Sequence, residues 1–91
     1  MRYKWDTRKN RRNLLIHGIT FEDAVTIFDG PTLETIDDRF DYGETRIYAV
    51  GIAHSLEIVV IYADVDEGER RVISARRAER HEREAYWKSI G

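Results

Sequence analysis

The fold of this chain is decided where an apolar strand passes into a charged helix, at the stretch Ile73-Ser74-Ala75-Arg76-Arg77-Ala78-Glu79-Arg80-His81-Glu82-Arg83-Glu84. We expect a strand over residues 70–75 and a helix over residues 77–88, so that Arg76, Arg77 and Arg80 lie within about one helical turn. Arginine presents a planar fork of donors that suits phosphate oxygens and keeps its charge at neutral pH. The junction therefore predicts a phosphate-binding surface for RNA.

The same residues allow a second interpretation, in which the helix is simply solvated. Glu79 with Arg83, and Arg80 with Glu84, stand at the i,i+4 spacing of helix surface ion pairs. Runs of charge more often face water than bind a ligand.

Three more strands are expected before the junction, over residues 33–36, 46–52 and 56–63. The third is almost wholly apolar, as in an interior strand covered on both faces. Short turns between consecutive strands give an antiparallel meander of four strands. Within residues 46–52, Arg46 and Tyr48 share one face because side chains alternate along a strand.

Two helices are expected before the sheet. Asp6 can cap a helix over residues 7–17 with Leu14 and Leu15 as its apolar face, and Gly18 is a natural stop. Phe21, Ala24, Val25 and Phe28 follow at the i, i+3, i+4, i+7 spacing of a second amphipathic helix. The fold class is thus α+β: two N-terminal helices, a four-stranded antiparallel sheet and a C-terminal helix in two layers, with Arg46 and Tyr48 on the open face.

Length and composition favour a single domain over residues 1–91. The absence of cysteine excludes disulfides and thiolate metal sites and fits a reducing cytosol. The N-terminus lacks the apolar segment of a signal peptide, and no apolar run approaches the ~20 residues of a membrane helix. We therefore expect a cytoplasmic protein that does not act at a membrane.

The net charge of −2 hides a segregation of charge along the chain. Residues 1–20 carry a net +5, residues 21–69 a net −11 and residues 70–91 a net +4. If the fold brings the ends together, the protein carries a focused positive patch, whereas its acidic middle can meet a basic partner.

Few side chains are suited to acid–base or metal chemistry. His17 ends a basic helix, where it can either transfer a proton near neutral pH or help to cap the helix. The acidic loop over residues 37–44 does not have EF-hand spacing, and the three histidines form no zinc motif, so we predict neither metal nor cofactor. The remaining chemistry is arginine with aromatics, which suits single-stranded RNA, with Tyr48 available for stacking.

The chain resembles the BrnT toxins over nearly its whole length. The resemblance rests on Trp5-Asp6, Lys9, Asn13, His17-Gly18, Phe21-Glu22-Asp23-Ala24, Phe28, Glu44-x-Arg46, Gly51, the residues from Ile73 to Ala78, Glu82-Arg83 and Tyr86. It implies a RelE-like fold and a ribonuclease that arrests translation in a type II toxin–antitoxin pair. It also implies a partner, the antitoxin BrnA, which neutralises the toxin, binds DNA and forms with it a complex that represses their promoter.

The resemblance and the arginines together suggest a metal-independent endoribonuclease. The RNA 2′-hydroxyl would attack its adjacent phosphate, with Arg46 and Arg76 stabilising the developing charge and His17 transferring a proton. Glu44 or Glu69 could replace His17 as the base. RNA-binding roles are expected for Lys9, Arg12, Arg77, Arg80 and Tyr48.

Two departures from the family bear on activity. Ile16 and Ile52 stand where relatives usually have cations, which suggests fewer contacts with RNA. Two other functions compete with the ribonuclease: a nucleic-acid binder without catalysis on the same basic surface, and a protein-interaction module whose acidic middle docks a partner.

Overall fold

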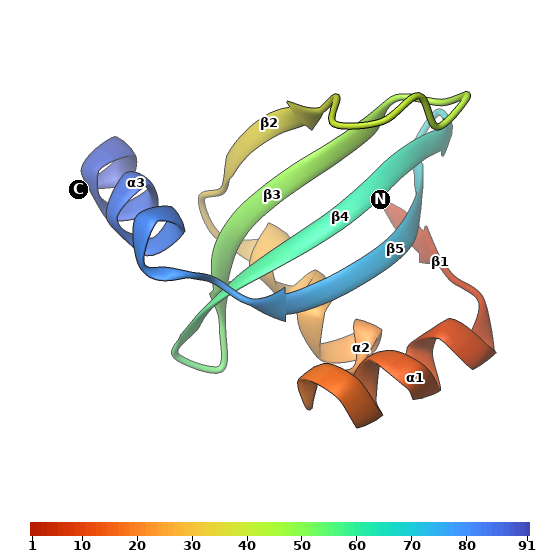
Figure 1. Cartoon of the computed structure of the whole chain (residues 1–91), viewed down its shortest axis with the longest axis horizontal. Helices are drawn as coiled ribbons and strands as arrows, with labels where there is room; N and C mark the ends of the chain where they lie inside the picture. The colour runs from red at the N-terminus through yellow and green to blue at the C-terminus, as the bar shows by residue number, and fades with distance from the viewer.

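A five-stranded sheet with strand order β1-β5-β4-β3-β2 forms the centre of the structure, a computed structural model that describes residues 1–91 (Figure 1). The strands are β1 (Arg2–Lys4), β2 (Leu33–Asp37), β3 (Arg46–Ala53), β4 (Leu56–Asp66) and β5 (Glu69–Arg77). The helices are α1 (Thr7–His17), α2 (Phe21–Ala24) and α3 (Arg80–Ile90), with a 3₁₀ helix, η1 (Val25–Asp29), after α2. None of these helices is long and apolar enough to cross a membrane.

The prediction of a four-stranded antiparallel sheet was wrong, although the class is α+β. β1 pairs with β5 in parallel, with Tyr3 opposite Arg70, so the sheet is mixed and has five strands. Lys4 Nζ lies 3.3 Å from the carboxylate of Glu69, which helps to hold this pairing. The three residues of β1 are too few to show a strand pattern, and their partner lies at the far end of the sequence.

The two predicted N-terminal helices also need correction, because only α1 is a full helix. α2 has four residues, capped where the Asp23 amide donates to Thr20 Oγ1 at 3.2 Å, and the chain then tightens into η1. Phe21, Ala24 and Ile27 are fully buried across α2 and η1. The apolar spacing thus identified the buried face but not the change of helix type.

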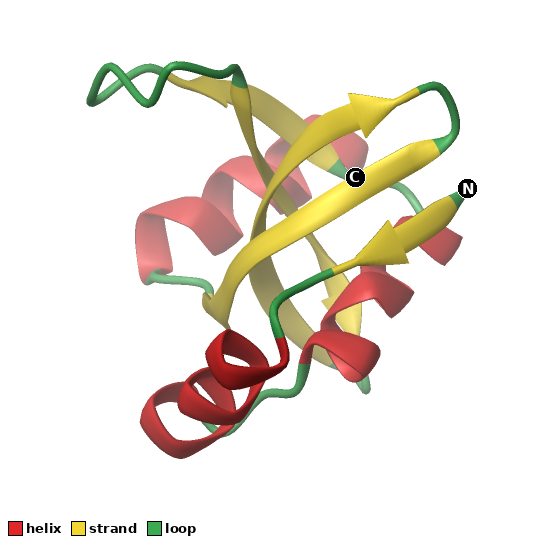
Figure 2. Cartoon of the chain, turned by 90° about the vertical axis from the view of Figure 1, so that its right-hand side faces the viewer, coloured by secondary structure: helices red, strands yellow, loops and turns green.

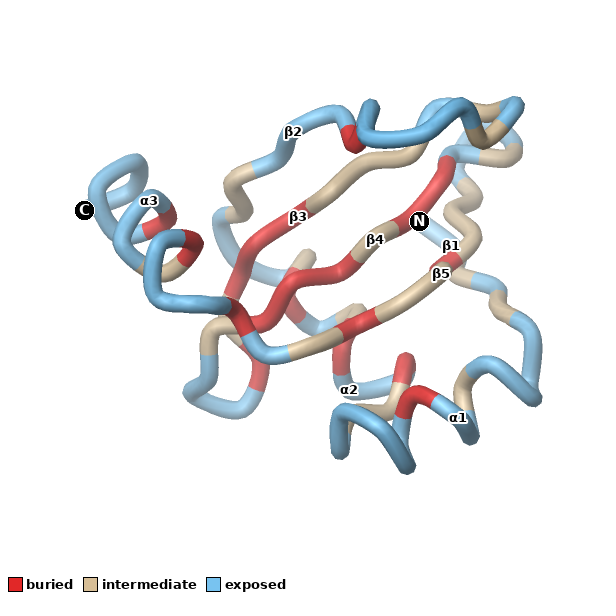
Figure 3. Tube along the Cα trace, in the orientation of Figure 1, coloured by how far each residue is buried: buried red, intermediate tan, exposed pale blue.

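Helices pack on both faces of the sheet, not on one as predicted for two layers (Figures 1 and 2). The larger core cluster joins α2 and η1 to one face. The smaller cluster lies on the opposite face, where Tyr86 of α3 packs against Val50 and Val59. Because α3 covers only one end of that face, the rest is left open, and we refer to it as the open face (Figure 3).

α1 is attached to the sheet by a polar side chain, and the predicted packing of Leu14 and Leu15 was wrong. Both leucines are exposed, and Asn13 is the only buried residue of the helix. The Asn13 amide donates to the Ala75 carbonyl at 2.8 Å and accepts from the Ala75 amide at 3.2 Å. β1 pairs only with residues 69–71 of β5, so Asn13 takes the place of a neighbouring strand farther along that edge.

Candidate functional site

The open face brings together four side chains from two strands. Arg46 and Tyr48 lie on β3, and Arg71 and Arg76 lie on β5. In the register, Tyr48 pairs with Ile61, which pairs with Ser74, and Val50 pairs with Val59, which pairs with Arg76. Arg46 and Arg76 therefore project from the same face, at levels on either side of Tyr48.

A β-bulge places the two arginines of β5 on this face. The β4–β5 register shifts between Ile61, which faces Ser74, and Tyr62, which faces Val72. Strict alternation would direct Arg71 and Arg76, five residues apart, to opposite faces. The bulge adds one residue to β5, so both guanidinium groups face the same side.

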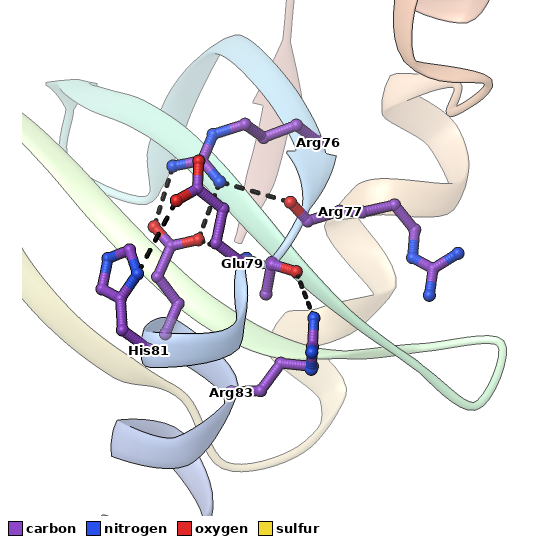
Figure 4. Close-up of polar contacts among 7 residues, drawn as sticks. Arg76, Arg77, Glu79, His81 and Arg83 are labelled. Atoms are coloured by element: carbon purple, nitrogen blue, oxygen red, sulfur yellow. Dashed lines mark hydrogen bonds and ion pairs between the residues drawn. The ribbon is translucent and has the colours of Figure 1, made fainter.

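Arg76 is held by a buried carboxylate at the start of α3. Its Nη1 and Nη2 atoms donate to the two carboxylate oxygens of Glu82, each at 2.8 Å (Figure 4). Glu82 is buried and also accepts from the Glu79 amide at 2.6 Å, in a capping box that fixes the first turn of the helix. The Arg76 guanidinium lies 5.9 Å from the centre of the Tyr48 ring. This arrangement fixes the direction of the Arg76 guanidinium, whose Nη1 and Nη2 atoms are both engaged by Glu82.

A hollow of about 370 Å³ adjoins Arg76, between the edge of β2 and the start of α3. Asp37 in its wall is buried, and hydrogen bonds from the Arg39 side chain hold the pKa of this carboxyl below its usual range. The lining residues with polar side chains are Thr35, Asp37, Asp38, Arg39, Tyr48, Arg76, Glu79, His81 and Glu82.

Arg46 is fixed by a different set of partners. Its guanidinium lies 3.9 Å from the centre of the Tyr42 ring, and Nη2 lies 3.6 Å from Oε1 of Glu44. Arg71 Nη2 donates to both oxygens of Glu44, with 2.7 Å to Oε2. One carboxylate is thus shared by two guanidinium groups, and the buried Arg46 Nε has no hydrogen-bond partner.

The predicted residues of α1 lie elsewhere. Lys9, Arg12 and His17 line a second hollow of about 240 Å³, which they share with Ile73 and Ser74 of β5. His17 therefore does not line the hollow beside Arg76. The residues of α1 flank the edge of β5, whereas Arg46 and Arg76 stand on the open face of the sheet.

The last two predicted RNA-binding arginines lie around the strand–helix junction. Arg77 is the last residue of β5, two residues beyond the expected end of the strand at residue 75, and its side chain points away from the Arg76 guanidinium (Figure 4). Arg80 is exposed and pairs with Glu84 at 2.9 Å, which is the solvated ion pair that the alternative interpretation expected.

Three residues of this region were not among the predicted site residues: Arg71, Glu82 and His81. The bulge that directs Arg71 to the open face has no sequence signature in β5. Glu82 was missed because the predicted helix began at residue 77, and because the residue that caps α3, Glu79, is not one of the usual capping residues that mark a capping box in a sequence. His81 follows Arg80 at the start of α3, and only the shared hollow relates it to Arg76. No group of three or more His, Cys, Asp or Glu side chains is placed to hold a metal ion.

Comparisons with known proteins identify the class of molecule that carries this site. The family model for the ribonuclease toxin, BrnT, of type II toxin–antitoxin systems matches residues 5–82. The 1.1 Å crystal structure of the Brucella abortus ribonuclease toxin BrnT is similar, with a TM-score of 0.67 and 27% sequence identity, over 88% of this chain and 99% of that one. A search of curated proteins finds no match.

These matches define a ribonuclease toxin of a type II toxin–antitoxin system. The chain belongs to the BrnT family.

Proposed function

We propose that the open face binds single-stranded RNA and cleaves it through attack of a ribose 2′-hydroxyl on the adjacent phosphate. A bond forms between the 2′-oxygen and phosphorus, and the bond from phosphorus to the 5′-oxygen breaks. The products are a 2′,3′-cyclic phosphate and a 5′-hydroxyl, and no metal ion takes part. The observation that carries the proposal is the placement of Arg46, Tyr48 and Arg76 on one solvent-facing surface of a chain from a ribonuclease toxin family.

Arg76 stabilises the negative charge that develops on the oxygens of the reacting phosphate, and Arg46, four residues or about 13 Å farther along the strands, binds the RNA backbone beside it. Fixed donors aimed at developing charge are typically worth about 10²–10³ in rate. Tyr48 offers its ring to a base, and Lys9, Arg12, Arg77 and Arg80 bind the flanking RNA backbone.

Two histidines are candidates for the proton transfers. His17 shares a hollow with Lys9 and Arg12, and His81 shares the hollow beside Arg76. We expect His17→Gln and His81→Gln to differ in kcat. Removing the group that transfers the proton lowers kcat by about 10²–10⁴, whereas removing the other histidine does not. A variant that affects only RNA binding raises KM and leaves kcat unchanged. If neither variant lowers kcat, Glu44 and Glu69 are the remaining candidates.

The test uses purified protein, a defined single-stranded RNA, and buffer with and without a chelator. Arg76→Ala alone leaves the buried Glu82 unpaired, which costs stability, so the arginine is removed in the pair Arg76→Ala/Glu82→Gln. We expect this pair to lose cleavage by about 10²-fold or more relative to Glu82→Gln alone. Arg2→Ala, at an exposed arginine of β1, is the matched control and keeps the wild-type rate.

Circular dichroism reports whether each variant is folded. If the folded double variant cuts RNA as fast as Glu82→Gln, Arg76 takes no part in catalysis. Activity that disappears with the chelator contradicts the metal-independent step.

The partner that follows from the type II family is a protein antitoxin. We propose a BrnA-like, DNA-binding antitoxin that neutralises the toxin in the cytoplasm by covering the open face and brings the complex to their promoter. Expression of the toxin alone then arrests growth, and co-expression of the antitoxin restores it. If the antitoxin restores growth but leaves Arg46 and Arg76 as exposed to solvent as in the free toxin, neutralisation works by another route.

A further inference from the structure

The Arg46–Glu44–Arg71 group, which we call the shared-carboxylate cluster, has an excess of positive charge. Glu44 is the single carboxylate that pairs with both Arg46 and Arg71. Arg76, in contrast, is matched one to one by Glu82 through two hydrogen bonds. The shared-carboxylate cluster therefore keeps one uncompensated positive charge on the open face.

The cluster also retains unused hydrogen-bonding capacity. A guanidinium has five N–H donors. Arg46 directs Nη2 to Glu44, and Arg71 likewise uses only Nη2 on Glu44, so the Nη1 group of each arginine makes no hydrogen bond. The Arg46 Nε is buried and is not counted among the donors open to a ligand. Side-chain packing holds the group, since the Arg46 guanidinium rests on the Tyr42 ring. A site with fixed donors and excess positive charge suits a phosphate group.

The position of the cluster relative to Arg76 indicates which phosphate it binds. Ile47 pairs with Tyr62 and Arg71 pairs with Ala63, so Arg46 and Arg71 stand at the same level across β4. Tyr48 is two residues farther along the strands, and Arg76 is level with Val50, two residues beyond Tyr48. Arg46 and Arg76 are therefore separated by four residues, which is about 13 Å along the strands at ~3.3 Å per residue. One phosphate group is too small to contact both Arg76 and the shared-carboxylate cluster across this separation.

We propose that the shared-carboxylate cluster is a second phosphate-binding subsite, which holds a phosphate of the same RNA strand other than the one that is cleaved. Arg76 contacts the reacting phosphate, an intervening base lies over Tyr48, and Arg46 with Arg71 binds the second phosphate. This inference rests on the proposed function, because it assigns Arg71 to the same RNA-binding face. Arg71 is a binding residue in this scheme and does not touch the reacting atoms.

The experiment measures binding of a fluorescent single-stranded RNA whose 2′-hydroxyls are all methylated, so that it cannot be cleaved. Fluorescence anisotropy gives Kd over a series of salt concentrations. We expect Arg71→Gln to weaken binding about tenfold and to reduce the slope of log Kd against log salt by about 0.7, the value for one phosphate contact on a single strand. Glu44→Gln removes the compensating charge and is expected to tighten binding several-fold.

Arg70→Gln is the matched control, because Arg70 is the adjacent residue of β5 but lies over the Phe28 and Tyr62 rings of the opposite face. It is expected to keep the wild-type Kd and salt slope. A folding defect in Arg71→Gln cannot imitate the proposed effect, since Glu44→Gln breaks the same ion pair and changes affinity in the other direction.

The outcomes separate this inference from the function on which it rests. If the wild type binds RNA and folded Arg71→Gln keeps its Kd and salt slope, the second subsite does not exist and the Arg76 site still stands. If Glu44→Gln weakens binding, Glu44 is a positioning residue and the excess-charge argument is overturned. If the wild type neither binds the methylated RNA nor cleaves the unmethylated one, the proposed function fails as well.

Discussion

Asn13 is the residue on which the placement of α1 depends. Its amide satisfies both backbone groups of Ala75 and donates to the Ile19 carbonyl at 2.9 Å. Asn13→Ala leaves buried backbone groups without partners, so we expect the free energy of unfolding to fall by about 2–3 kcal/mol in urea denaturation. Leu15→Ala is the control on the same helix and stays within about 0.5 kcal/mol, because Leu15 is 86% exposed. Equal losses for the two variants contradict this account of the helix.

Asp37 makes stability depend on pH through its hydrogen bonds from Arg39. These bonds lower the pKa of the Asp37 carboxyl from its ordinary 3.8, so the folded state favours the charged form. A lowered folded pKa gives a stabilisation that is complete above the unfolded pKa and disappears as pH falls through the folded value. We expect wild type to exceed Asp37→Asn in unfolding free energy at pH 6 and this advantage to shrink as the pH falls below about 4.

Chemical denaturation at a series of pH values measures this difference. Asp38→Asn is a suitable control, because Asp38 is the adjacent exposed residue and forms no ion pair. A gap between wild type and Asp37→Asn that stays constant from pH 6 to acid shows that the Arg39 pairing does not set the pH dependence.

Among the elements, β3 and η1 approach each other at a glycine. A Cβ added to Gly51 would lie 2.7 Å from Ile27 Cβ, which is fully buried. We expect Gly51→Ala to destabilise the fold by about 1–3 kcal/mol through overpacking, seen as a lower thermal midpoint. Gly30→Ala is the matched control, because its Cβ would meet nothing within 4 Å and its φ of −124° suits any residue. If Gly51→Ala and Gly30→Ala have the same thermal midpoint, η1 shifts to make room for the added methyl group at little cost in stability.

The elements also show how far sequence reasoning extends. Capping by Asp6, the apolar run of β4 and the charged last helix were visible as local patterns, and those elements form near the expected residues. β1 was not identifiable as a strand, because its pairing with β5 depends on contacts across the whole chain. The end of β5 was placed too early, since its last residues pair with Val59 and Ile58 although their side chains are charged.

The candidate site, like the fold, could be predicted from the sequence only in part. Alternation along β3 correctly placed Arg46 and Tyr48 on one face, and Arg76 reaches it from β5. Arg71 could not be assigned, because its direction depends on a bulge, and His17 was grouped with Arg76 only through the family resemblance. The alternation of side chains thus predicts which residues of one strand share a face. Which residues of different strands lie together depends on the pairing register of the sheet, which the sequence does not show.

For the molecule as a whole, the basic ends of the chain meet and the acidic middle lies on other elements. β1 runs beside β5, and α1 packs against the edge of β5. On α1, Arg8 and Arg11 are exposed and form no ion pair, unlike Arg39, Arg46 and Arg71 farther along the chain. A protein of net charge −2 therefore presents a positive surface beside the open face. Under the proposed function, this surface attracts an RNA strand before specific contacts form.

This distribution predicts a rate effect that is separate from the chemistry. In the pair Arg8→Gln/Arg11→Gln, we expect slower RNA association and a weaker dependence of the association rate on salt, because long-range attraction is screened beyond about 10 Å at 0.1 M salt. Cleavage at saturating RNA is unchanged, since neither arginine lies in a hollow of the proposed site. Stopped-flow fluorescence measures association, and the same substitution at exposed Lys88 of α3 is the control. An association rate equal to wild type at low salt shows that α1 does not steer the substrate.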